Sequence, residues 1–153
     1  MLAEALRTLE DHLPGGILDG LEASSLHQAR GTAELLAASG SGVEVHQGGD
    51  ASWTVIFDPG EARLPFCVGR VVRVKPVPTW QRVVSLVEPL AAHLQTVGVA
   101  GLGDETRAMA EMFARAGATR VTGFTDLPFP SPWWHHDGRG PLAALVRWVD
   151  LEE

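Results

Sequence analysis

The chain has 153 residues, of which 45% are apolar and 20% are charged. This balance is typical of one globular domain that buries its own core, and it argues against disorder over the whole chain. The net charge of -7 repels phosphate backbones, so nucleic acid is excluded as an expected partner.

The N-terminus and the single cysteine indicate the expected compartment. Met1 to Glu4 contain no basic region followed by an apolar run, so no secretory leader is indicated. No stretch approaches the roughly 18 uninterrupted apolar residues of a membrane span. Cys67 alone cannot form an internal disulfide. We therefore expect a cytoplasmic protein without a membrane span.

Residues 1–40 are expected to form a helical lead-in. Pro14, Gly15 and Gly16 end a first helix, whose apolar stripe consists of Leu2, Ala5, Leu6, Leu9 and Leu13. A second helix is predicted to begin at Ser25, with Gln28 completing a capping box, and to end near Gly40. Its inward positions are Leu26, Ala29, Ala33 and Leu36.

Residues 43–77 are expected to form strands. Val43–His46 and Trp53–Phe57 are short and rich in β-branched and aromatic residues, and turn residues separate them. Val68–Val77 is a third strand. Its alternation between Val72 and Lys75 predicts one face that meets water or a ligand.

Residues 79–124 are expected to alternate between helix and strand. Thr79 is suited to cap a helix that Pro89 should kink or split. A strand over Gln95–Ala100, a helix over Asp104–Ala116 ended by Gly117, and a strand over Arg120–Phe124 follow. This spacing predicts a parallel, right-handed βαβ unit.

Residues 125–153 begin as an irregular stretch that ends at Gly140. Pro141 is suited to the first turn of a final helix, which would place Leu142, Leu145, Val146 and Val149 on one side. The whole chain, residues 1–153, is therefore predicted to be a single α/β domain.

Three glycines lie between a predicted strand and the helix that follows it: Gly98, Gly101 and Gly103. This is the setting of a dinucleotide-binding turn. Read from Gly101, however, the G-x-G-x-x-G pattern has Thr106 where the third glycine belongs, and Asp104 and Glu105 would repel a pyrophosphate. We favour a tight turn over a phosphate site.

Cys67 is the one thiol of the chain. A nucleophilic cysteine needs a helix N-terminus or a neighbouring cation to lower its pKa. Arg63 and Arg70 are near in sequence, but the immediate neighbours are apolar and lead into a strand. A buried, inert thiol is favoured over a nucleophile.

The loop from Ser131 to Gly140 combines side chains that a core does not need: Trp133, Trp134, His135, His136, Asp137 and Arg139. Adjacent histidines point in different directions and no H-x-x-x-H spacing occurs, so no metal is expected. Asp137 is suited to orient a histidine, and Arg139 to pair with a carboxylate. Two roles stay open, namely polar contacts that rigidify the loop and a surface that faces a ligand.

The end of the chain resembles the C-terminus of the LuxC-type, long-chain acyl-CoA reductases, a branch of the aldehyde dehydrogenase superfamily. The likeness starts at about Trp53 and covers about two thirds of the chain. The segments that carry it are Trp134-His135-His136-Asp137-Gly138-Arg139, Leu145-Val146-Arg147-Trp148-Val149-Asp150, Leu94-Gln95-Thr96-Val97-Gly98, Ala118-Thr119-Arg120-Val121 and Arg70-Val71-Val72-Arg73-Val74.

The resemblance implies a three-layer αβα fold with a mostly parallel sheet, similar to part of the aldehyde dehydrogenase catalytic domain. It also implies reduction of a fatty acyl thioester, such as acyl-CoA, to an aldehyde with NADPH. In that family a cysteine thiolate holds the acyl group as a thioester before hydride releases the aldehyde.

The chain departs from the family pattern in the residues that carry the chemistry. The family's N-terminal nucleotide-binding region has no counterpart, and its catalytic cysteine lies upstream of the matching segments. Cys67 falls in the segment that follows that position, so the nucleophile is not transferred to it. The glutamate of the related E-x-F-G-P motif is also absent around Leu64–Cys67.

We therefore expect the C-terminal portion of an acyl-CoA reductase that is inactive alone and needs an N-terminal region or partner subunit. Its loop would line or buttress the acyl site through Trp134, His135, His136, Asp137 and Arg139, and His135 or His136 would donate to the carbonyl oxygen. The alternative is a non-catalytic interaction domain that uses the Trp133–Trp134 region to bind a partner. A homo-oligomer is compatible with both.

Overall fold

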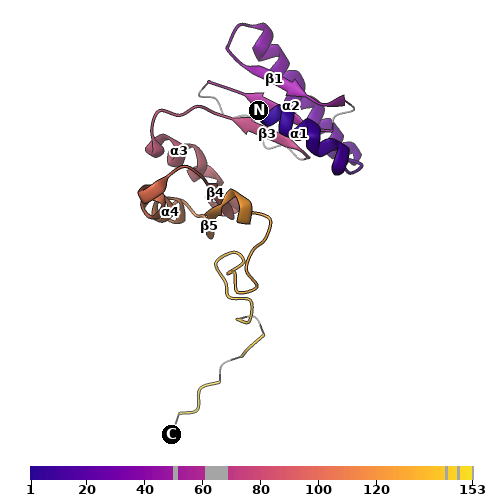
Figure 1. Cartoon of the computed structure of the whole chain (residues 1–153). Coiled ribbons are helices and arrows are strands. Elements are labelled where there is room, and N and C mark those ends of the chain that lie inside the picture. The colour runs from indigo at the N-terminus through magenta and orange to yellow at the C-terminus, as the bar shows by residue number, and fades with distance from the viewer. Residues whose placement is uncertain (50–51, 61–68, 144, 148, 153) are drawn as a thin grey trace. The chain divides into compact units, whose positions relative to one another are not determined.

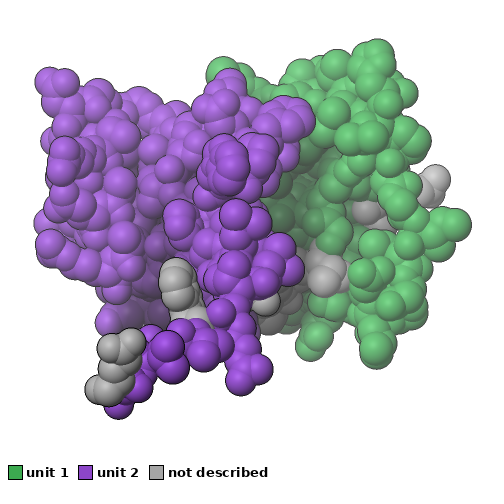
Figure 2. Space-filling view, turned by 90° about the horizontal axis from the view of Figure 1, so that it is seen from below, with its two compact units in different colours: residues 1–76 green, residues 77–153 purple. Residues whose placement is uncertain are grey.

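The computed structural model describes residues 1–49, 52–60, 69–143, 145–147 and 149–152. These residues form both helices and strands, and the strands include parallel pairs, which confirms the α/β class (Figure 1). The chain divides into two compact units, Met1–Pro76 and Val77–Glu153, which are coloured separately in Figure 2. The single domain expected over residues 1–153 stays a prediction.

Unit 1 contains two α-helices, α1 (Leu2–His12) and α2 (Gly20–Ala38), and a three-stranded sheet. The sheet has the order β1 (Glu44–Gln47), β2 (Thr54–Phe57), β3 (Val71–Val74). β1 pairs antiparallel with β2, whereas β2 pairs parallel with β3. All three strands lie where the sequence predicted them, although part of the third predicted strand falls at Val68, outside the described residues.

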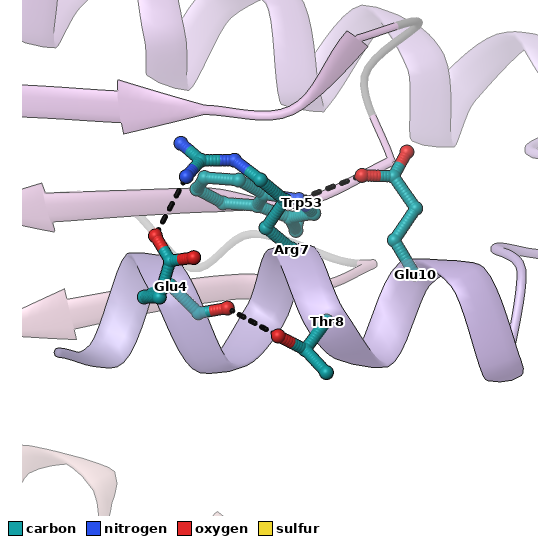
Figure 3. A network of polar contacts seen from close by, with 5 residues as sticks. All are labelled: Glu4, Arg7, Thr8, Glu10 and Trp53. Atoms are coloured by element: carbon teal, nitrogen blue, oxygen red, sulfur yellow. Dashed lines mark hydrogen bonds and ion pairs between the residues drawn. The ribbon is translucent and has the colours of Figure 1, made fainter.

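Side chains alternate between the two faces of a strand, and in β2 and the residue before it the side chains of both faces are buried. On one face, Ile56 is fully buried and packs in a cluster with Val43 of the same unit and Ala33 of α2. On the opposite face, Trp53 is 1% exposed and its indole Nε1 donates to Glu10 Oε2 of α1 at 2.9 Å (Figure 3). Unit 1 is thus a small three-layer αβα arrangement.

Helix α2 begins five residues before the predicted start at Ser25, so that prediction was wrong. Asp19 is the N-cap, and its side chain accepts hydrogen bonds from the backbone N–H groups of Leu21 and Glu22, both at 2.8 Å. Glu22 Oε2 in turn accepts from the Asp19 backbone N–H at 3.0 Å. This capping box satisfies the free backbone donors six residues earlier than Ser25 and Gln28 would.

An ion pair joins the carboxyl ends of the parallel strands β2 and β3. Lys75 Nζ lies 2.6 Å from Asp58 Oδ2 and donates to the Gly60 carbonyl at 2.7 Å. The Asp58 side chain is only 5% exposed, and its second oxygen accepts from the Gly60 backbone N–H. Lys75, which the alternating pattern predicted to face water or a ligand, therefore neutralises the buried Asp58 carboxylate.

Unit 2 contains the predicted parallel βαβ unit, with β4 (Thr96–Val99) and β5 (Arg120–Gly123) paired in parallel. Helix α3 (Trp80–Val87) is capped by Thr79, and the 3-10 helix η2 (Glu88–His93) follows it where Pro89 was predicted to split the helix. The 3-10 helix η3 (Gly103–Glu105) leads into α4 (Thr106–Arg115). Helices α3 and α4 pack against the β4–β5 pair through an apolar cluster built on Met109, Phe113 and Ala118.

The final helix predicted after Pro141 was wrong for the residues that the structure describes. After the 3-10 helix η4 (Phe124–Asp126), the described residues form loops and turns. The apolar side chains predicted to share a helix face are more than half exposed: Leu142, Leu145, Val146 and Val149. A short helix gains most of its stability by packing such a face against another surface, and these side chains have none within the unit.

The capping box makes a direct prediction. Asp19→Ala should lower the free energy of unfolding by about 1 kcal/mol, because it removes two hydrogen bonds to the start of α2. Urea denaturation followed by circular dichroism measures the change. Asp11→Ala, which removes an exposed acid near the end of α1, is the matched control and should change stability by less than about 0.5 kcal/mol. Equal effects of the two variants would contradict the assigned start of α2.

Candidate functional site

The loop singled out by the sequence forms a tight turn in unit 2, after β5. Asp137 and Gly138 both adopt left-handed backbone angles, with φ of 51° and 74°. The Gly138 N–H donates to the His135 carbonyl at 3.1 Å, and the Arg139 N–H donates to the His136 carbonyl at 3.0 Å. A non-glycine residue in this conformation is uncommon, so the side-chain contacts of Asp137 need an explanation.

Gln95, the residue before β4, anchors this turn. Its side-chain Nε2 donates to Asp137 Oδ1 at 3.0 Å and lies 3.3 Å from His136 Nε2. Its backbone carbonyl accepts from the N–H groups of Thr119 and Arg120, both at 3.0 Å, and from the Thr119 hydroxyl at 3.1 Å. One residue therefore joins the β4–β5 pair to the loop that lies 41 positions later in the chain.

The charge of Asp137 is stabilised by these contacts. The hydrogen bond from Gln95 lowers the pKa of its carboxyl below the ordinary value of 3.8, and its neighbours His136 and Arg139 act in the same direction. His136 Nδ1 lies 3.1 Å from Asp137 Oδ2. Asp137 is thus an exposed carboxylate that holds neighbouring donors in place at neutral pH.

The two histidines have different surroundings. The Gln95 amide can only donate through Nε2, so His136 Nε2 is its acceptor and the proton of the neutral ring lies on Nδ1, facing Asp137. Both nitrogens of His136 are therefore used within the loop. The ring of His135 lies beside Gly140 and is exposed, and within the described part of the chain its nitrogens make no hydrogen bond.

Trp134 connects the turn to strand β5. Its ring centroid lies 4.9 Å from that of His136, and the Arg120 guanidinium lies 5.8 Å from the Trp134 ring centroid. Arg120 is held by hydrogen bonds to the carbonyls of Asp126 at 2.6 Å and Leu127 at 2.9 Å. The Trp134 Nε1 donor is buried and lacks a partner among the described residues, whereas Trp133 is 73% exposed.

The structure brings four of the five predicted site residues into one connected group: Trp134, His136, Asp137 and, through its charge on Asp137, Arg139. Arg139 makes no ion pair with a carboxylate in the ranges that the structure describes. No contact between the His135 ring and these residues is found in the described part of the chain. Asp137 lies 3.1 Å from His136, and its role in orienting a histidine stays a prediction.

Sequence reasoning missed Gln95 and Arg120 as parts of this group. Gln95 stands directly before β4 and Arg120 is the first residue of β5. Both fall in segments that carried the family resemblance, Leu94–Gly98 and Ala118–Val121. A polar residue at the start of an otherwise apolar strand was the available signal. It does not by itself indicate a partner 41 residues away.

The glycine-rich turn after β4 forms a tight turn. Gly101 and Gly103 have positive φ, of 72° and 52°, and Thr106, which stands at the third glycine position, donates its hydroxyl to the Gly103 carbonyl. Gly98 lies within β4 against Leu127, and a Cβ there would lie 2.6 Å from Leu127 Cδ1. Packing explains Gly98 without a phosphate.

Two further expectations concern Cys67 and metal ligands. Cys67 lies outside the described residues. Across the described ranges, no three or more His, Cys, Asp and Glu side chains gather as a metal ion would require. The described helices also include none that is long and apolar enough to span a membrane.

The chain is thus an α/β protein in which a polar turn is held to a parallel strand pair by a side-chain hydrogen bond and lies beside an aromatic ring. The chain belongs to the acyl-CoA reductase (LuxC) family, whose sequence model matches residues 1–148. The match confirms the resemblance and extends it to the N-terminal part of the chain, where the likeness was less clear from the sequence alone. A comparison with curated proteins finds no match.

The hydrogen bond from Gln95 predicts a change in the titration of Asp137. Gln95→Ala should raise the pKa of Asp137 toward 3.8, because the largest cause of its lowering is removed. A carboxyl whose pKa is lowered on folding contributes stability above its ordinary pKa and loses it as the pH falls through the lowered value. Carbonyl-detected NMR titration measures the shift. Gln81→Ala, on the exposed side of α3, should leave the titration of Asp137 unchanged, and a shift of the same size there would contradict the assignment.

The different surroundings of the two histidines predict different effects on the turn. His136→Ala should speed amide hydrogen exchange at Gly138 and Arg139 several-fold, because a side-chain hydrogen bond contributes about 1 kcal/mol. His135→Ala, which removes a ring without such a bond, is the control and should leave both rates near the wild-type values. Equal acceleration by both variants would refute the brace role of His136.

Proposed function

We propose that this chain takes part in the NADPH-dependent reduction of a fatty acyl thioester to an aldehyde. It contributes the portion of an acyl-CoA reductase that carries the Trp133–Gly140 loop, while the nucleophile and the nucleotide-binding region belong to another part of the enzyme or to a partner subunit. The membership in the LuxC family supports the reaction class. On this proposal the chain is inactive alone.

The observation that carries the proposal is the bracing of the loop by Gln95. A loop that only connects elements needs no side-chain anchor from a distant strand, whereas a ligand-facing loop must hold its donors in a fixed geometry. The contacts of Gln95 with Asp137 and His136 provide that anchor. They leave the His135 ring and the buried Trp134 Nε1 as donors without a partner among the described residues.

The division of roles within the loop follows from these contacts. His136 and Asp137 are positioning residues, because their polar atoms are used on each other and on Gln95. His135 is the better candidate to donate to the carbonyl oxygen of an acyl group, since its ring nitrogens stay available. Arg139 is exposed and suited to interact with an anionic group of the substrate.

The strand–helix turn of unit 2 does not fit the pyrophosphate of NADPH. Asp104 and Glu105 occupy η3, directly before α4, where their charges oppose an anion. Thr106 takes the position at which a third glycine would admit the phosphates. We therefore assign no hydride-transfer step to these residues and place cofactor binding in the other part of the enzyme.

A second candidate function is a non-catalytic interaction domain. The observation that favours it is the exposure of large apolar side chains in unit 2, including Phe129 at 77% and Trp133 at 73%. A protein surface of this kind is suited to bind a partner. On this alternative the braced loop presents Trp133 to another chain and not to a substrate.

The purified chain should show no acyl-CoA-dependent oxidation of NADPH above the rate without protein. Absorbance at the nicotinamide band measures the rate, with Cys67→Ala as the matched variant. Activity that Cys67→Ala abolishes would overturn the proposal that the nucleophile lies elsewhere. Light scattering on the same preparation separates the two candidate functions, because a stable monomer argues against an interaction surface that must be covered.

A further inference from the structure

Unit 1 contains a cavity of about 540 Å³ beside the connection between α1 and α2. This volume lies in the range of small-molecule sites, roughly 300–1,000 Å³. Apolar side chains form one part of the wall, namely Ile17, Leu18, Ala23 and Leu26, and the backbone of Gly15 and Gly16 forms another. Nothing in the proposed reductase function uses this cavity.

Two polar atoms on the wall are buried without a hydrogen-bond partner among the described residues, Arg70 Nη1 and Ser52 Oγ. The other terminal nitrogen of Arg70 donates to the Pro14 carbonyl at 3.1 Å, which fixes the guanidinium against the α1–α2 connection. A buried guanidinium donor without an acceptor is costly, and native structures rarely leave one. The cavity therefore offers two donors that an incoming oxygen can satisfy.

Glu10 also borders the cavity and brings a negative charge. Its Oε2 is occupied, because it accepts the indole N–H of Trp53 at 2.9 Å (Figure 3). The carboxylate is thus held on the sheet side of α1 by a partner outside the cavity wall. It weakens the attraction of Arg70 for an anion without taking the Arg70 Nη1 donor.

We propose that this cavity binds a small carboxylate with an apolar body. The carboxylate oxygens accept from Arg70 Nη1 and the Ser52 hydroxyl, and the apolar body lies against Leu18 and Leu26. A charged oxygen pair suits a guanidinium better than a neutral carbonyl does, because a charge-assisted hydrogen bond is about twice as strong. The site belongs to unit 1 and does not rest on the reductase function proposed for the loop of unit 2.

Isothermal titration with octanoate tests the proposal, with octan-1-ol as the probe of equal chain length that lacks the charge. We expect octanoate to bind at least tenfold more tightly, which is the effect of a hydrogen bond to a charged group. Octanoyl-CoA has the same acyl chain with a neutral thioester carbonyl in place of the carboxylate. Like octanol, it should bind at least tenfold more weakly than octanoate. Equal binding of octanoate and octanol, or tighter binding of the CoA thioester, would overturn the assignment.

Three variants connect the binding to the named side chains. Ser52→Ala removes a hydroxyl that makes no hydrogen bond within the described ranges, so the fold should persist while octanoate binding weakens several-fold. Arg70→Met should abolish the preference for octanoate over octanol. Glu10→Gln keeps an oxygen for Trp53 but removes the charge, and it should tighten octanoate binding.

Arg7→Met is the matched control in the same unit, because Arg7 pairs with Glu4 on the exposed side of α1. It should leave octanoate binding unchanged. If Arg70→Met unfolds the protein through loss of the Pro14 contact, Ser52→Ala and Glu10→Gln decide the question by themselves. Unchanged binding in both of these variants would refute the site.

Discussion

The loop geometry of unit 2 depends on Gln95. Its carbonyl accepts hydrogen bonds from Thr119 and Arg120 at the start of β5, and its side-chain amide donates to Asp137 in the loop. One residue therefore links the parallel strand pair to the loop. The left-handed conformation of Asp137 persists because the Gln95 amide and His136 hold its carboxylate in place. Without this anchor the segment after η4 would be held to the strands mainly through Arg120, which contacts the Trp134 ring and the carbonyls of Asp126 and Leu127.

The contacts of Gln95 with the loop bear on the roles that the family motif suggests for His136 and Asp137. Motifs that identify a family are often taken as catalytic, but His136 and Asp137 use their polar atoms on their neighbours. Their placement accounts for a recognisable sequence without requiring either to touch a substrate. Among the described residues, the exposed His135 ring makes no hydrogen bond, whereas the unpaired Trp134 indole N–H is buried.

Much of the fold was predictable from local patterns. Strand positions, the Thr79 cap and the split at Pro89 follow from side-chain periodicity and backbone chemistry that act over a few residues. The start of α2 was missed because two acceptable capping boxes stand six residues apart, and the structure uses the one formed by Asp19 and Glu22. The final helix failed because its apolar face has nothing to pack on in the described unit, and the contact of Gln95 with Asp137 spans too much chain for a local pattern to reveal.

Because Gly98 has no side chain, Leu127 can pack directly against β4. Leu127 fills the space above this position, with Cδ1 2.6 Å from where a methyl group would stand. Leu127 also offers its carbonyl to Arg120, whose guanidinium faces the Trp134 ring. A methyl group at this position would require the Leu127 side chain to shift. Leu127 thus takes part both in the packing against β4 and, through its carbonyl, in holding the arginine that faces the loop.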